Sequence, residues 1–518
     1  MADRDRAFFG HPIGLSNLFF TEMWERFSYY GMRAFLMAYL IAPESVGGRG
    51  MLETTGGSVM AVFGSSVYFL ALPGGWIADR FLGQRKAVIV GGVGIAVGNA
   101  ILAMPDNGKL FYLGLTLIAL GTGFLKPNIS TLVGQLYKPG DGRRDSGYTI
   151  YYMGINIGAF IAPFACGFLA QSDTFREWAV EKGFSPSIVW NFAFGASALG
   201  MVLGLIQFVS FKHLLGDAGL HPTIPDDPAR AQRDRHVLIG ILVALVALGV
   251  TVVLAEPSGD LIANVQGVGL MVGAIIMFVA LYKSARDDKE RRGVLAIIPL
   301  FLGAIAFFAI FEQAPSTLSI YALKLTEPDF LGFFEPSYYQ SINAVFIIAF
   351  APVFAWIWLS LAKKGKEPTS VNKFAIGMVL LSFSFIAMLP ALGATETARV
   401  SGWFLTILYL FNTFAELCIS PVGLSSMSKL APQRLAGMVM GMWFFATGIG
   451  IWLAGRATVI TAKFSFDTLF ITLIIASLAV AGALFVVAPR IKRMMGEDGL
   501  NAEIPADLPE ARVVEKDA

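Results

Sequence analysis

The chain has 518 residues, of which 55% are hydrophobic and only 15% are charged, whereas about 25% of the residues in soluble globular domains are charged. This composition excludes a soluble globular protein and a disordered one, and it predicts a chain that lies in a lipid bilayer. The same composition excludes a nucleic-acid partner. The formal net charge of +2 gives almost no overall field, so functional charges must act through their individual positions.

Apolar segments of about 20 residues, the length of helix that crosses about 30 Å of hydrocarbon, follow one another along the chain. They are continuous, unlike the short alternating segments of a membrane β-barrel. The sequence therefore predicts an all-α polytopic membrane protein with 14 transmembrane helices. The predicted helices cover residues 13–42, 56–78, 86–104, 110–136, 147–170, 187–211, 237–255, 261–282, 294–323, 338–362, 372–392, 402–428, 433–462 and 467–489.

The Lys and Arg residues outside these helices predict which side of the membrane each loop faces. An even number of helices puts both termini on one side, where the loops and ends hold about 26 of these cations, against about seven on the other side. Because cytoplasmic loops are enriched in Lys and Arg, both termini are predicted to be cytoplasmic. Residues 1–12 do not resemble a cleavable signal peptide, so we expect the first helix to stay in the membrane.

A charged stretch with three prolines, at 213–236, divides the chain. The next two apolar runs hold no charged residue, so we expect them to lie at the periphery. Without them the helices number six plus six, which is typical of transporters built from two related halves around a midplane site. The predicted units are an N-terminal six-helix bundle (1–212), a cytoplasmic linker (213–236), an extra two-helix hairpin (237–284), a C-terminal six-helix bundle (285–490) and a cytoplasmic tail (491–518).

Ionisable residues inside a span are functional candidates, because a charge in hydrocarbon is costly unless it is paired or hydrated. In the first span, spacings of three, four and seven place the side chains of residues 22, 25, 26, 29, 30 and 33 on one face, which we expect to line a cavity. An ion pair of Glu22 with Arg26 that only stabilises the helix is the simpler interpretation, but a buried pair gains little. The ionisable candidates are Glu22, Glu25, Arg26, Arg33, Lys126, Glu312 and Glu416.

The six-plus-six arrangement pairs these charges across the two bundles. The first and fourth helices of one bundle correspond to the first and fourth of the other, so Arg33 and Lys126 face Glu312 and Glu416. The opposite signs predict ion pairs that close the two ends of the cavity in turn. They also predict a dipolar site, with a basic wall and an acidic wall, for a zwitterionic substrate.

A proton is the expected co-substrate. The seven groups carry three positive and four negative charges, so one bound proton would neutralise the empty cavity. Burial raises the pKa of a carboxyl group and a neighbouring cation lowers it, so a change of partner can switch its protonation. None of the four histidines falls inside a span. The candidate proton carriers are Glu22, Glu25 and Glu312.

Uncharged side chains of the spans are weaker candidates. Aromatic residues in a helix more often pack than bind, but beside these charges they could line pockets for varied side chains. Arg456 is expected only to extend toward the membrane surface, and Cys166 and Cys418 lie in apolar runs that do not suggest a disulfide. The aromatic candidates are Tyr68, Tyr152, Phe308, Phe311 and Trp443, and the amides expected to face the cavity are Asn156 and Asn343.

Four motifs carry a family resemblance. The pattern E-x-x-E-R-F-x-Y-Y at residues 22–30 resembles the first-helix signature of the proton-dependent oligopeptide transporter (POT/PTR) family. GGWIADRFLGQRK (74–86) resembles the loop motif of the major facilitator superfamily, and YYMGINIG (151–158) and FAELCISPVG (414–423) resemble further signatures of the peptide transporters. The resemblance implies the major facilitator fold and a bacterial member with an extra hairpin.

The resemblance also implies a role for each site position. Arg26 and Lys126, with Arg33 nearby, would bind the carboxylate of a peptide, and Glu416, Asn156 and Asn343 its amino terminus. Glu22, Glu25 and Glu312 would couple protons, while Arg33 with Glu312 would close the outside and Lys126 with Glu416 the inside. The side-chain pockets would be lined by Tyr30, Tyr68, Tyr152, Phe308, Phe311 and Trp443.

The sequence departs from the family pattern at two places. Some members carry Trp where this chain has Phe308, and animal relatives use a helix-two histidine that this chain lacks. The proton route is therefore expected to rest on carboxylates.

These observations predict a proton-coupled symporter of di- and tripeptides in an inner (plasma) membrane, monomeric and without a cofactor or metal. A carrier of nitrate or another small zwitterion or anion is the alternative within the class, although Glu416 argues against an anion carrier, and a sugar or drug carrier is a weaker one. An enzyme would need a nucleophile beside a base, or a metal cluster, which the spans do not offer. A receptor or structural protein would leave the cavity charges unexplained.

Overall fold

The computed structural model describes residues 5–105, 108–138, 141–222, 227–255, 259–328, 330–430 and 436–495. Within them, 12 helices are long and apolar enough to cross a membrane. Two further helices, α1 (Gly14–Ile41) and α9 (Pro228–Ala255), have 28 residues each, about 42 Å at 1.5 Å per residue. The chain is thus an all-α multi-pass membrane protein, and the described helices include the fourteen membrane-length ones that the sequence predicts.

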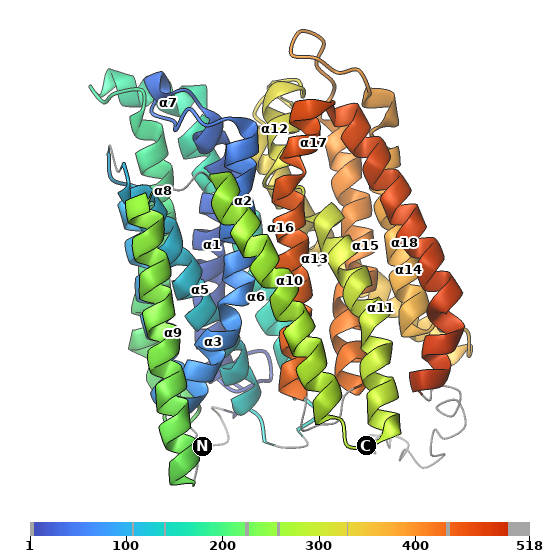
Figure 1. The fold of residues 1–518 in the computed structure, drawn as a ribbon. Helices are drawn as coiled ribbons and strands as arrows, with labels where there is room; N and C mark the ends of the chain where they lie inside the picture. The colour runs from blue at the N-terminus through green and yellow to red at the C-terminus, as the bar shows by residue number, and fades with distance from the viewer. Residues whose placement is uncertain are drawn as a thin grey trace, which may run out of the picture.

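Two groups of helices stand side by side (Figure 1). We call α1 to α8 the N-terminal bundle and α11 to α18 the C-terminal bundle. The N-terminal bundle contains α1, α2 (Glu53–Phe69), α3 (Ala71–Ile77), α4 (Gln84–Leu102), α5 (Leu110–Gln135), α6 (Arg144–Gln171), α7 (Asp173–Glu181) and α8 (Ile188–Phe211). The C-terminal bundle contains α11 (Asp288–Phe311), α12 (Thr317–Lys324), α13 (Tyr339–Lys363), α14 (Ser370–Ile386), α15 (Trp403–Leu430), α16 (Ala436–Arg456), α17 (Thr458–Lys463) and α18 (Phe466–Met495).

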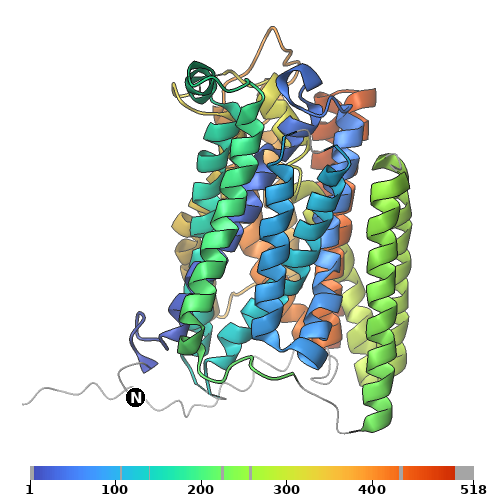
Figure 2. The same cartoon turned by 90° about the vertical axis from the view of Figure 1, so that its left-hand side faces the viewer.

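The hairpin between the bundles consists of α9 and α10 (Gly259–Ser284). Figures 1 and 2 show α9 at the edge of the molecule, where it packs against α5. In contrast, α10 packs against both α2 and α16. The first residue of α1 and the last of α18 lie at the same end of the bundles, and α7, α12 and α17 lie at the opposite end, which we call the outer end (Figure 1).

Proline interrupts two of the predicted helices. The run at 294–323 was expected to form one helix, but α11 ends at Phe311 and α12 begins only at Thr317, around Pro315. The run at 56–78 is likewise divided between α2 and α3, three residues before Pro73. Proline has no N–H to donate and its ring clashes with the preceding turn, so helices end or bend just before it. The first of these breaks leaves Glu312 at a helix end.

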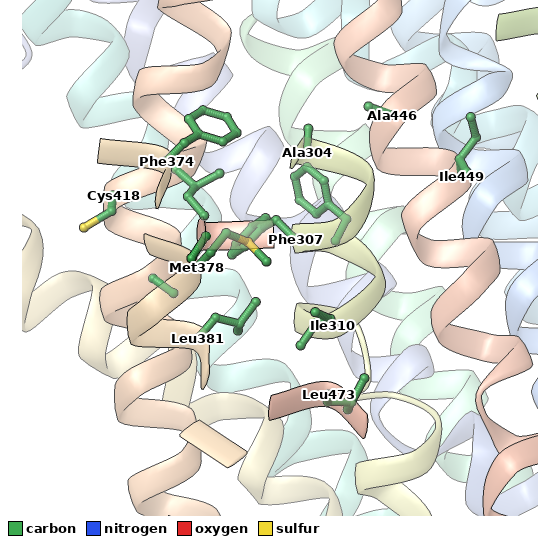
Figure 3. Packing of buried hydrophobic residues seen from close by; sticks show 14 of the residues in the cluster. Ala304, Phe307, Ile310, Phe374, Met378, Leu381, Cys418, Ala446, Ile449 and Leu473 are labelled. Atoms are coloured by element: carbon green, nitrogen blue, oxygen red, sulfur yellow. The ribbon is translucent and has the colours of Figure 1, made fainter. Parts of the chain in front are cut away.

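Each bundle has a hydrophobic core of its own. In the C-terminal bundle, Phe307 of α11, Phe374 and Met378 of α14 and Ile449 of α16 belong to one buried cluster (Figure 3). In the N-terminal bundle, Phe35 of α1 is buried and its ring centroid lies 4.8 Å from that of Phe194. Between the bundles, α2 packs on α16 and α6 packs on α13. We call these two contacts the seams between the bundles.

Hydrogen bonds of Arg143 hold the segment before α1, at the end of the bundles where the described chain begins and ends. Arg143 donates hydrogen bonds to the Asp5 carboxylate (3.0 Å), to the Gly10 carbonyl (3.2 Å) and to Asp141 (2.8 Å). The Arg143 guanidinium lowers the pKa of Asp141 to about 2. The Asp141 carboxylate therefore stays charged at any physiological pH.

Candidate functional site

The first part of the site is a cluster of three charges on α1. Glu22, Glu25 and Arg26 are 1%, 0% and 3% exposed. Arg26 Nε lies 3.2 Å from Glu22 Oε1, and Arg26 also pairs with Glu25. Among the described residues, Glu25 Oε1 and Arg26 Nη2 have no hydrogen-bond partner. One guanidinium thus serves two carboxylates, and the cluster keeps a donor and an acceptor unused.

Gly158 of α6 allows this helix to pack closely against the charge cluster on α1. A Cβ atom on Gly158 would lie 2.3 Å from the Met23 carbonyl oxygen and 2.9 Å from Arg26 Cβ, so only glycine lets α6 approach α1 this closely. The same motif places Tyr151 next to Glu22, with its hydroxyl 3.4 Å from Ser130 Oγ. The YYMGINIG motif therefore builds the wall of the charge cluster.

Gly158→Ala is expected to lower the stability of the protein by about 1–3 kcal/mol, because the added methyl group would force α1 and α6 apart. The thermal unfolding midpoint of the purified protein in detergent measures this loss. The matched control is Gly482→Ala on α18, where an added Cβ meets no atom within 4 Å and the midpoint should stay or rise. An unchanged midpoint for Gly158→Ala would contradict the close packing of α1 and α6.

Lys126 extends the charged region from α5. Its Nζ lies 4.3 Å from the centroid of the Tyr68 ring on α2. A Cβ on Gly74 would lie 2.3 Å from the Gly123 carbonyl oxygen, so these two glycines bring α3 and α5 together near this contact. The positive charges of Lys126 and Arg26 are close enough to repel each other. In the described part of the chain Lys126 forms no ion pair, so the Lys126–Glu416 pair expected to close the inside is not formed in this structure.

Glu416 lies on α15, in the other bundle. The Asn343 amide of α13 donates hydrogen bonds to Glu416 Oε2 (3.0 Å) and to the Thr413 hydroxyl (3.1 Å). No Lys or Arg of the described residues pairs with Glu416. Asn156, the other amide expected beside it, donates instead to the Tyr152 carbonyl oxygen on its own helix (3.0 Å). The acidic side of the site is therefore Glu416 supported by an amide.

Arg33 of α1 and Glu312 form an ion pair that joins the two bundles. Both side chains are 11% exposed. Glu312 can reach across because α11 ends there, and Arg33 also lies 5.9 Å from the centroid of the Tyr29 ring. Of the two gating pairs expected from the sequence, the structure thus joins one and leaves the other apart.

The aromatic candidates fall into two groups. The guanidinium carbon of Arg26 lies 5.8 Å from the centroid of the Tyr30 ring. The Tyr152 side chain is 44% exposed. Phe308 and Trp443 are buried and their ring centroids lie 5.8 Å apart, while Phe311 stacks on Phe307 at 5.1 Å. Tyr30 and Tyr68 therefore lie next to the charges and Tyr152 is accessible, whereas the other three belong more to the packing of the C-terminal bundle.

Sequence reasoning missed several polar contacts. Tyr151 and Thr413 belong to predicted helices but lack a charge that would single them out. Lys324, at the end of α12, lies just outside the predicted helix at 294–323, and its Nζ lies 2.8 Å from Glu53 Oε1 at the start of α2. This ion pair is a second link between the bundles at the outer end, where residues of both bundles line a cavity of about 1310 Å³.

The expectation that Arg456 only extends toward the membrane surface is wrong. Arg456 Nη1 lies 2.5 Å from Asp260 Oδ1 of α10, and Arg456 also contacts the Ser58 hydroxyl of α2. The reason is that α10 lies beside α16, so Asp260 in the first turn of α10 comes to lie next to Arg456 at the end of α16.

The comparisons with known proteins point to one family. The sequence pattern of the POT family matches residues 85–475. A peptide transporter of Yersinia enterocolitica subsp. palearctica is 37% identical over 510 residues, which cover 95% of this chain and 96% of that protein. A di-/tripeptide transporter of Lactococcus lactis subsp. cremoris is 34% identical over 507 residues, which cover 95% of this chain and 98% of that one. The crystal structure of a peptide transporter named POT, in complex with sulfate, has a TM-score of 0.84 at 39% identity over 94% of this chain and 96% of that chain.

Proposed function

This chain belongs to the POT family, and from that premise we propose that it is a proton-coupled symporter that imports di- and tripeptides by alternating access. The observation that carries the proposal is the division of charge between the bundles. Lys126, without an ion pair among the described residues, lies in the N-terminal bundle, and Glu416 lies in the C-terminal bundle with only amide support. A basic wall and an acidic wall suit a substrate that carries one charge of each sign.

The two ends of a peptide match these two walls. Lys126 and the unused donor of Arg26 would bind the carboxylate, and Glu416 would bind the amino group. Lys126 and Glu416 are partly exposed although they lie well inside membrane-length helices, and Tyr68 beside Lys126 is partly exposed as well, as expected of side chains that line an opening between the bundles. A carrier of a simple anion would not need Glu416 held in place by Asn343.

Proton coupling would rest on carboxylates that share or exchange a cation. Glu22 and Glu25 compete for Arg26, so this buried cluster carries one excess negative charge, which a proton would neutralise. A proton on Glu312 would remove the attraction that holds Arg33 and release the outer end. Lys126 and Glu416 would then pair to close the inner end in the opposite state. With Arg33 and Glu312 joined and the second pair apart, the structure corresponds in this scheme to the inward-facing state.

We place the transporter in an inner (plasma) membrane with both termini in the cytoplasm, as the distribution of Lys and Arg predicts. In this orientation the Arg33–Glu312 pair lies nearer the outer end of the bundles. A single copy of the chain contributes both walls of the site, so we propose that the monomer is the transporting unit.

Glu416→Gln is expected to weaken the binding of free dipeptides by about 10- to 100-fold, because the amide keeps the shape and loses the charge that attracts an amino group. N-acetylated dipeptides have no charged amino group, so their weaker binding should change by less than about threefold. Competition of both ligands against labelled dialanine uptake in proteoliposomes measures the two effects.

The matched control for this substitution is Glu181→Gln on the exposed end of α7, which should leave both ligands unaffected. An equal loss for free and blocked peptides in Glu416→Gln would remove Glu416 from the recognition of the amino group.

A further inference from the structure

The inner helix of the extra hairpin, α10, is divided between a face on protein and a face on lipid. Ala263, Gly267, Leu270 and Ala274 recur at helical spacing and are buried. On the other side, large apolar residues are about two-thirds exposed. These residues are Val265, Val268, Ile275 and Ile276. The buried face of α10 lies over the seam between α2 and α16 (Figure 1).

On the α2 side of the seam, α10 is held by hydrogen bonds of Gln266. Its amide donates to Ser66 Oγ (2.8 Å), and its carbonyl oxygen accepts from Ser65 Oγ (2.9 Å). A polar side chain in hydrocarbon is costly to leave unpaired, so these bonds fix α10 to the N-terminal bundle.

On the α16 side, α10 is held by Trp452 and Arg456. Trp452 Nε1 donates to the Ala263 carbonyl oxygen (2.7 Å), and a Cβ on Gly267 would lie only 2.2 Å from the Trp452 ring. The Arg456 side chain pairs with Asp260 Oδ1 at 2.5 Å. The same helix is thus attached to both bundles at once.

These attachments meet where the two bundles are closest. A Cβ on Gly57 of α2 would lie 2.5 Å from the Gly455 carbonyl oxygen of α16, so the two backbones nearly touch near the outer end. Next to this contact Ser58 is fully buried, and its hydroxyl donates to Asp260 Oδ1 (2.6 Å) and contacts Arg456. Ser58, Asp260 and Arg456, one residue from each of α2, α10 and α16, form what we call the seam triad.

We propose that Asp260 of the extra hairpin is a positioning residue of the outer gate: it holds Arg456 against Ser58 and so favours the state in which the outer ends of α2 and α16 are closed. To open the outer end, α2 and α16 must separate at Gly57 and Gly455. If α10 then stays on α2, the bonds from Arg456 and Trp452 break. If it stays on α16, the bonds from Ser58 and Gln266 break. Either way, the hairpin adds to the cost of opening, in addition to the pairs Arg33–Glu312 and Lys324–Glu53.

This inference rests on the alternating access proposed above, and its test reads conformation directly. Spin labels on Cys substitutions of Glu181 (α7) and Thr397 report the distance between the bundles at the outer end by double electron–electron resonance in nanodiscs. Both positions are exposed, whereas Cys166 and Cys418 are 0% and 1% exposed and should resist labelling. Because no substrate is needed, the distances remain informative even if the chain does not transport peptides.

Asp260→Asn is expected to raise the ratio of outer-open to outer-closed molecules by about three- to tenfold. Asp260→Glu keeps the carboxylate, so its outer-closed population should stay near that of the unsubstituted protein. Arg456→Gln should act like Asp260→Asn, and the double variant should open no further than the larger single one, because both remove the same contact. The control Asp173→Asn removes the same charge from an exposed pair with Arg176 at the same end and should change nothing.

An unchanged distance distribution in folded Asp260→Asn, or equal opening by Asp173→Asn, would overturn the proposal. Asp260 is half-exposed, so the protein should tolerate its substitution. Arg456→Lys is a second variant: it keeps the positive charge but loses the planar guanidinium, and it should shift the distance distribution toward the outer-open state by a smaller amount.

Discussion

Lys126→Ala is expected to abolish both proton-driven uptake and counterflow exchange of peptides, with at least about a 100-fold loss in apparent affinity. Lys126 is a cation inside the membrane that forms no ion pair in the described part of the chain and whose ammonium group lies over the Tyr68 ring. In the proposed site this charge binds the carboxylate that every free peptide carries. Uptake and counterflow of labelled dialanine in proteoliposomes measure both losses.

Lys138→Ala, at an exposed cation just beyond the end of α5, is the matched control and should keep both activities. Affinity within about threefold of the unsubstituted protein in Lys126→Ala would contradict the assignment of the carboxylate site.

Glu22→Gln and Glu25→Gln are expected to reduce proton-driven accumulation to the level seen with an uncoupler, while counterflow exchange persists. Glutamine matches glutamate in size but cannot carry the proton. Exchange needs only peptide binding and reorientation of the loaded carrier, so it does not require the proton site to empty. The comparison of gradient-driven uptake with counterflow, on the same vesicle preparation, separates the two steps.

The control for these substitutions is Glu44→Gln, at an exposed position beyond the end of α1. If Glu25→Gln accumulated peptide like the unsubstituted protein, the coupling role given to this cluster would be lost. A defect in only one of the two variants would identify the carboxylate that titrates.

Much of the fold follows from properties that need no knowledge of distant contacts. The length of each apolar run depends on the thickness of the bilayer, so helix number and type could be predicted from the sequence. The charges of α1 share one face because of helical geometry alone. The pairing of Arg33 with Glu312 could be anticipated because related halves place corresponding helices opposite each other.

The contacts that the sequence did not reveal depend on where helices come to lie. Arg456 and Asp260 are 196 residues apart, and nothing in either local sequence indicates that α10 lies beside α16. The break before Thr317 required reading Pro315 as a helix end within an otherwise apolar run. Asn156 satisfies a carbonyl of its own helix, a local alternative that an argument from cost in lipid cannot distinguish from a cavity contact.

The sequence also does not show which of the two expected ion pairs is formed in a given conformation. In the proposed cycle the same residues form either the Arg33–Glu312 pair or the Lys126–Glu416 pair, and a balance between two conformations decides which pair forms. The structure contains the Arg33–Glu312 pair. It also contains two further contacts at the outer end, the Lys324–Glu53 pair and the seam triad. All three contacts lie between the bundles or across their seam, so we predict that they break together when the outer end opens.

The most direct test of the proposed function is uptake of radiolabelled dialanine into proteoliposomes under an inward proton gradient, with and without an uncoupler and with excess unlabelled tripeptide. Proton-coupled peptide symport predicts concentrative uptake that the uncoupler abolishes and that excess tripeptide inhibits by competition. No accumulation by protein that is monodisperse and shows a cooperative thermal transition would contradict proton-coupled peptide symport.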